Sequence, residues 1–93
     1  VKDNVAMAGH RMANGSRALM ENVPQADAII VQRLKAAGAI MLGRTNLPEF
    51  AHRILTDSPT FGITRNPWNP DHTPGGSTGG GSAALAAGVG PLA

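Results

Sequence analysis

The feature that most constrains this chain is a glycine-rich stretch near its end, TPGGSTGGGSAALAAG, from Thr73 to Gly88. It holds six glycines and two serines in sixteen positions. Glycine loses more conformational entropy on folding than any other residue, so such a run needs a structural reason. We expect a tight turn, followed by a helix over residues 79–89 whose small side chains let another segment approach closely.

Two familiar glycine motifs do not fit this stretch. A P-loop needs a lysine after its second glycine to neutralise phosphate, and the stretch contains none. The segment Gly75–Gly79 matches the Gly-x-Ser-x-Gly pattern of a nucleophile elbow, but that motif requires a preceding strand and a later histidine. Here the preceding segment is rich in proline, and every histidine comes before Ser77. From residue chemistry alone, a flexible connector whose Ser and Thr cap the next helix stays open.

The composition of the 93 residues is that of one small globular domain, with 42% hydrophobic and 15% charged residues. The formal net charge is +2, and the lysines and arginines are scattered, so we expect no direct contact with nucleic acid. The absence of cysteine excludes disulfides and thiolate zinc sites. His10, His52 and His72 lack metal-ligand spacing, and no apolar run is long enough to cross a membrane.

The first half of the chain predicts strands and helices in alternation. Residues 1–5 are expected to end a strand, and an ordered loop follows. Residues 26–39 predict a helix whose apolar face includes Ile30 and Leu34, with Asp27 at its start. The apolar run 39–42 predicts a short buried strand.

The second half adds a helix, a loop and a further helix. Asn46 is expected to cap a helix, with Pro48 in its first turn and Glu49 three residues after the cap. A proline-rich loop over residues 53–74 leads to the glycine stretch. The whole order predicts an α/β fold with a mixed β-sheet flanked by α-helices.

Four blocks of the sequence, in order and over nearly the whole chain, resemble the amidase signature family. They are VKDN at the start, ADAIIVQRLKAAGAIMLGRTNLPEFA, FGITRNPWN and PGGSTGGGSAALAAG. The last block is similar to that family's Gly-Gly-Ser-Ser-Gly-Gly motif. The resemblance implies that residues 1–93 are the N-terminal part of the catalytic core of an amidase signature domain, truncated at both ends.

The resemblance also implies roles for individual residues. Members of the family hydrolyse or transfer amides with a Ser–cis-Ser–Lys triad and no cofactor or metal. By position, Lys2 matches the lysine base and Ser77 the bridging serine, whose preceding peptide bond is cis in the family. Gly75, Gly76, Thr78 and Gly79 complete the expected active-site loop. Thr78 stands where a second serine is usual, which leaves the role of that side chain open.

The family's nucleophilic serine is expected beyond Ala93, and Ser82 lies too near Ser77 to replace it. Asp3 would hold Lys2 charged if both side chains faced the same way, but alternation along a strand should separate them. We expect a cytoplasmic amidase acting on a linear small-molecule amide. Two alternatives stay open: the glutaminase subunit of a tRNA-dependent amidotransferase, and a catalytically inactive fragment.

Overall fold

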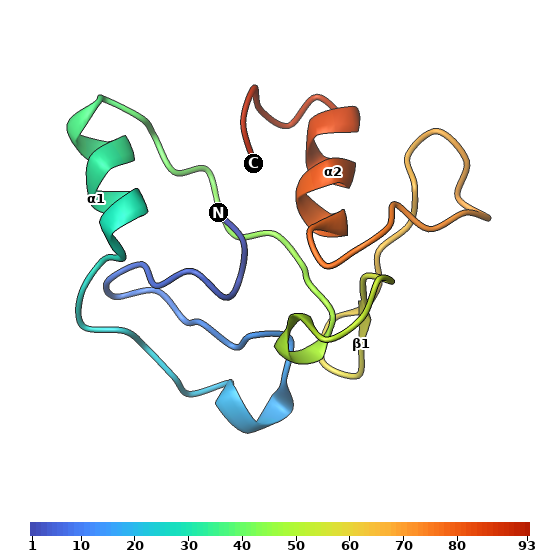
Figure 1. Ribbon diagram of the computed structural model, residues 1–93, viewed down its shortest axis with the longest axis horizontal. Coiled ribbons are helices and arrows are strands. Elements are labelled where there is room, and N and C mark those ends of the chain that lie inside the picture. The colour runs from blue at the N-terminus through green and yellow to red at the C-terminus, as the bar shows by residue number, and fades with distance from the viewer.

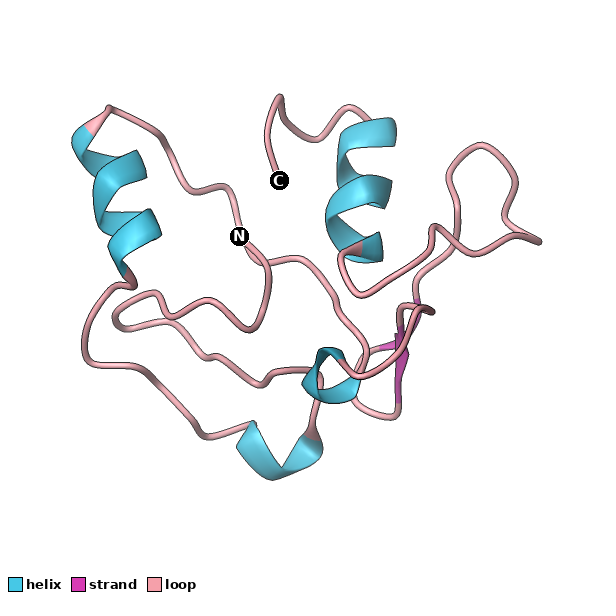
Figure 2. Ribbon diagram, viewed as in Figure 1, coloured by secondary structure: helices cyan, strands magenta, loops and turns pink.

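The computed structural model describes residues 1–93 and is dominated by ordered loops (Figures 1 and 2). Its helices are η1 (Arg17–Leu19) and η2 (Glu49–Ala51), both 3₁₀, and the α-helices α1 (Ile29–Ala36) and α2 (Gly79–Ala86). The strands β1 (Asp57–Ser58) and β2 (Gly62–Ile63) form a two-stranded antiparallel sheet. Elsewhere, Lys2 and Thr45 form an isolated parallel bridge. The predicted α/β class is confirmed, with much less β-sheet than expected.

The chain forms a thin slab with extents of 38 × 31 × 16 Å. Figure 1 shows α1 and α2 on opposite sides of the centre, where both termini lie. Since a helix with its side chains is about 10–12 Å across, the slab is little more than one element thick. The buried apolar side chains are correspondingly few: Met7, Ala13, Val31 and Leu47.

The predicted strand at residues 39–42 is wrong. This segment is irregular, and Ile40 and Leu42 are 84% and 72% exposed. Ile30, expected on the buried face of its helix, is 60% exposed, while Val31 is fully buried. The physical reason is the same in each case: no other part of these 93 residues packs over these side chains.

Two predicted helix starts also differ from the structure. Asp27 does not cap α1, whose N-cap is Ala28. Its carboxylate instead accepts hydrogen bonds from Lys35 Nζ and the Ala8 amide, each at 2.7 Å, and these contacts lower its pKa. Asp27 therefore ties α1 to the N-terminal loop.

The helix predicted after Asn46 is only the single 3₁₀ turn η2. Pro48 occupies its N-cap position, without a side-chain cap, and Phe50 and Ala51 have positive φ angles. The Asn46 side chain instead donates to Thr64 Oγ1 at 3.2 Å, across to the residue after β2. A tertiary contact thus replaces the expected local cap.

Helix α2 forms as expected, and its glycines allow close packing. A Cβ atom on Gly80 would collide with the backbone of Asn46, and Gly79, Gly80 and Gly81 are all buried. The small side chains therefore let the start of α2 lie directly against the backbone around Asn46. The longest helices, α1 and α2, have eight residues each, which is too short to span a bilayer.

Gly80→Ala should lower the free energy of unfolding by about 1–3 kcal/mol, because overpacking against Asn46 outweighs the better helix propensity of alanine. Thermal unfolding of the protein measures this effect. Gly43→Ala is the matched control, since nothing lies within 4 Å of the added Cβ and the φ angle is ordinary. Equal melting temperatures for the two variants would contradict the close-packing explanation.

Candidate functional site

Lys2 and Ser77 lie in direct contact although 75 residues separate them in the chain. Lys2 Nζ donates a hydrogen bond to Ser77 Oγ at 2.7 Å and a second to Thr78 Oγ1 at 3.0 Å. Ser77 and Lys2 are partly buried. The structure therefore brings together the predicted lysine and serine, and it gives the Thr78 hydroxyl, whose role the sequence leaves open, a partner in the same cluster.

Backbone pairing with residues 43–45 positions Lys2. Thr45 N donates to Val1 O at 2.9 Å, and Asp3 N donates to Thr45 O at 3.1 Å. The strand end expected over residues 1–5 is limited to the bridge at Lys2, because Asp3 begins a turn in which Val5 N donates to Lys2 O at 3.0 Å. The Asp3 carboxylate accepts from Arg44 Nε at 2.8 Å in a largely buried ion pair. Lys2 and Asp3 thus have separate partners, as expected, although Asp3 lies in a turn rather than in a strand.

The glycines before and after Ser77 shape the turn that presents it. Gly75 has a φ of +82°, which is strained for any residue with a side chain, and the Gly76–Ser77 peptide bond is cis, as the resemblance implies. A Cβ on Gly76 would lie 2.7 Å from the carbonyl carbon of Ile54. One on Gly79 would collide with the side chain of Thr56. These close contacts explain why the stretch around Ser77 contains so many glycines.

Sequence reasoning missed Thr56, whose side chain contacts both ends of this turn. Its hydroxyl donates to Gly75 O at 2.8 Å and accepts from Gly79 N at 3.1 Å. The residue is 2% exposed. Nothing in the spacing or type of a single threonine in a loop could have singled it out.

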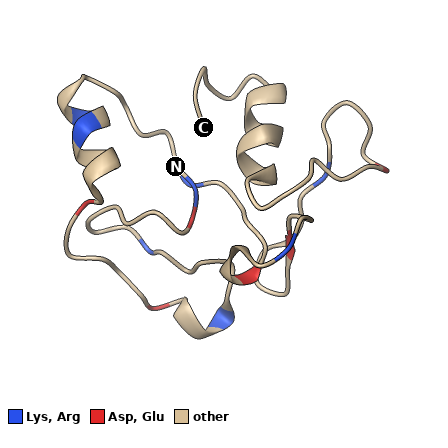
Figure 3. Ribbon diagram, in the orientation of Figure 1, with Lys and Arg blue, Asp and Glu red and all other residues tan.

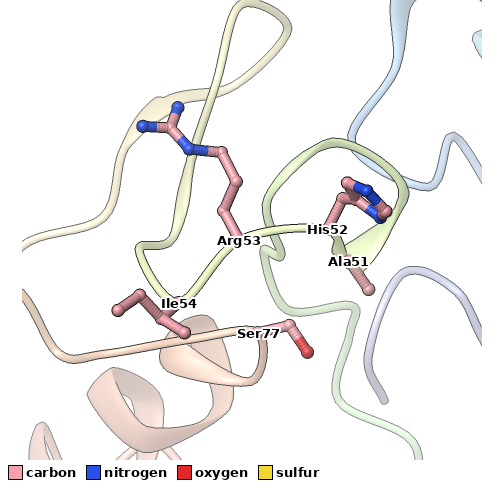
Figure 4. Close-up of a pocket in the computed structure, with 5 residues that line it drawn as sticks. All are labelled: Ala51, His52, Arg53, Ile54 and Ser77. Carbon is pink, nitrogen blue, oxygen red and sulfur yellow. The ribbon is translucent and has the colours of Figure 1, made fainter.

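A shallow pocket of about 330 Å³ lies beside Ser77 (Figure 4). Its other lining residues form one continuous segment, Ala51, His52, Arg53 and Ile54. In Figure 4 the Arg53 side chain extends away from Ser77, and its guanidinium pairs with Asp57 at 3.2 Å. The pocket places open space next to the Ser77 side chain, where a reacting group could lie.

The remaining polar candidates do not join this cluster. Ser82 is exposed in the first turn of α2, and its hydroxyl donates to the Thr78 carbonyl at 3.4 Å. No group of three or more His, Asp or Glu side chains could hold a metal ion. Charged residues are spread along the chain rather than gathered in one place (Figure 3).

Comparisons with known proteins show to which family this chain is related. The family model described as Amidase matches residues 1–93. The A subunit of the glutamyl-tRNA(Gln) amidotransferase of Thermus thermophilus is 53% identical over 93 residues, which are 100% of this chain and 20% of that protein. Indoleacetamide hydrolase of Bradyrhizobium diazoefficiens is 48% identical over 93 residues, 100% of this chain and 18% of that protein.

Solved structures agree with the sequence comparisons. The crystal structure of a peptide amidase in complex with the competitive inhibitor chymostatin superposes with a TM-score of 0.89 at 43% identity, covering 95% of this chain and 19% of that one. The chain thus spans about a fifth of the length of the relatives that it matches. With a family model that matches from the first residue to the last, this chain belongs to the amidase signature family of hydrolases.

Proposed function

We propose that these residues are the N-terminal part of the catalytic core of a longer amidase, which hydrolyses a small-molecule carboxamide to an acid and ammonia or an amine. The observation that carries this proposal is the 2.7 Å contact between Lys2 Nζ and Ser77 Oγ, beside an open pocket. Membership of the family supports the reaction class.

In this proposal Ser77 relays a proton and Lys2 is the final base. A serine hydroxyl can accept one hydrogen bond and donate another. Once the Lys2 amine is neutral, the hydrogen bond between the two can run from Ser77 to Lys2, so Ser77 can take a proton from the attacking group while passing its own to the amine. The proton then returns along the same path to the leaving nitrogen when the C–N bond breaks. Thr78 accepts a hydrogen bond from Lys2 and so helps to orient its amine.

The attacking group in this proposal is a second serine outside these 93 residues. The much greater length of the relatives supports a longer protein. Ser82 is a poor candidate, because its hydroxyl bonds to the helix backbone and contacts neither Lys2 nor Ser77. By itself, the 93-residue chain would therefore be inactive.

A glutaminase subunit of a tRNA-dependent amidotransferase is the second candidate. It is favoured by relatives that are named as A subunits of glutamyl-tRNA(Gln) amidotransferases, one of them 53% identical to this chain. Lys2 and Ser77 would do the same work in that enzyme, with glutamine as the amide and the ammonia passed to a partner. We favour the free-standing amidase, since TNLPEFAH and RNPWNP resemble the broad amidases more closely.

Lys2→Ala and Ser77→Ala, each in the full-length protein, should lower amide turnover by about 10²–10⁴-fold, the usual contribution of a positioned acid–base group. Ammonia release under steady-state conditions measures this loss. Lys35→Ala and Ser82→Ala are the matched controls, because both residues are exposed and lie outside the cluster. Near-normal turnover in either Lys2→Ala or Ser77→Ala would refute the role of that residue.

A serine-directed fluorophosphonate should label the full-length protein at a serine outside residues 1–93, and should leave Ser77 and Ser82 unmodified. The reagent reports the attacking oxygen, which in this proposal belongs to neither residue. Peptide mapping by mass spectrometry locates the label. Stoichiometric modification of Ser77 would show that it attacks directly, and would overturn the relay.

The full-length protein should release ammonia from simple carboxamides without added partner proteins. A coupled ammonia assay with indoleacetamide, a peptide amide and glutamine compares the two candidate functions. Turnover of glutamine alone, dependent on the other proteins of an amidotransferase, would instead support the second candidate.

A further inference from the structure

We infer that Thr56 is a positioning residue for the relay, holding the turn that carries Ser77 at its working distance from Lys2. This inference rests on the proposed function. In this role Thr56 does not contact the substrate, and its buried hydroxyl is not part of the proton path.

Thr56 is itself firmly held. It is 2% exposed and lies directly before β1, where its carbonyl accepts from Thr64 N at 2.9 Å. This hydrogen bond joins the backbone of Thr56 to the chain that leaves β2. The hydroxyl therefore projects from the base of the β1–β2 hairpin rather than from a free loop.

The hydroxyl of Thr56 connects the two ends of the turn. It donates to the Gly75 carbonyl at 2.8 Å and accepts from the Gly79 amide at 3.1 Å. A hydroxyl has a single proton to donate, and here its donor and one acceptor position are both used. Only Gly76, Ser77 and Thr78 lie between the two attachment points.

The hydrogen bond from the Gly79 amide to the Thr56 hydroxyl also caps helix α2. Gly79 begins α2, so its amide has no partner within the helix, and the N-cap residue Thr78 makes no side-chain cap. The Thr56 hydroxyl supplies the missing acceptor, and this leaves the Thr78 hydroxyl available to Lys2. One threonine side chain thus frees another for the candidate site.

The backbone next to Thr56 supports the turn from the same side. The Ile54 carbonyl group lies against Gly76, and the Thr56 side chain occupies the space that a Cβ on Gly79 would need. Residues 54–56 therefore act as a template against which the turn is shaped. If the hydroxyl were lost, the two turn ends would be free to move apart, and Ser77 would shift relative to Lys2.

Thr56→Val in the full-length protein tests this inference, since valine keeps the shape of threonine and removes only the hydroxyl. We expect kcat for a carboxamide to fall by about 10²-fold, the loss that a displacement of about 1 Å can cause, with KM changed less than about threefold. Thr56→Ser keeps the hydroxyl and should retain kcat within about threefold of the parent.

Thr60→Val is the matched control. Thr60 lies in the same hairpin, and its hydroxyl is buried without a hydrogen-bond partner. The same chemical change there should leave kcat and KM unaltered. Because Thr60→Val removes no hydrogen bond, it controls for the threonine-to-valine change itself, whereas loss of the two hydrogen bonds of the Thr56 hydroxyl lowers kcat in Thr56→Val alone.

A kcat within about twofold of the parent in folded Thr56→Val would overturn the inference. If that variant does not fold, Thr56→Ser and Thr56→Ala replace it, because they differ only in the hydroxyl, and equal kcat values for these two would be the overturning result. Failure of the proposed function is a separate outcome, visible as normal turnover in Lys2→Ala and Ser77→Ala, whatever Thr56 does.

Discussion

Three consecutive residues, Arg44, Thr45 and Asn46, hold together the parts of the chain that form the candidate site. Arg44 pairs with buried Asp3, and Thr45 forms the parallel bridge with Lys2. The backbone of Asn46 lies against Gly80 at the start of α2. One short segment therefore locates the lysine on one side and the serine turn on the other. A buried ion pair that loses one partner typically costs about 3–5 kcal/mol, so Arg44 links the stability of this junction to the geometry of the site.

The glycines explain how two such distant segments meet. Helix α2 has almost no side-chain bulk in its first turn, and this lets its backbone lie on the backbone of Asn46. The lack of a side chain at Gly79 also leaves room for Thr56, and the lack of one at Gly76 leaves room for the Ile54 carbonyl. Glycine in a helix is unfavourable by about 1 kcal/mol relative to alanine, so close packing, rather than helix stability, accounts for its presence here.

The thinness of the slab has a consequence for its apolar residues. Ile29, Ile30, Ile40 and Leu42 are all more than half exposed, although their sequence pattern is that of a protein interior. Sequence periodicity reports which residues suit burial, but burial itself needs a second layer. Within these 93 residues few apolar side chains are fully covered, Val31 and Leu47 among them.

Short motifs and their order were enough to predict the family, the glycine turn, the start of α2, and Lys2 and Ser77 as candidate partners. The separation of Asp3 from Lys2 was also expected, but strand alternation does not explain it, because Asp3 lies in a turn. Residue chemistry alone did not show whether the glycine-rich stretch is a flexible connector or part of an active site, since such turns occur in both. The resemblance to the family was needed to choose between them. The partners of the polar side chains were beyond such reasoning. Asn46 bonds to Thr64 instead of capping a helix, and Thr56 reaches the site because the hairpin returns it to the glycine turn. A polar side chain bonds to whichever group the fold brings within about 3 Å, and long-range contacts that no local pattern contains select that group.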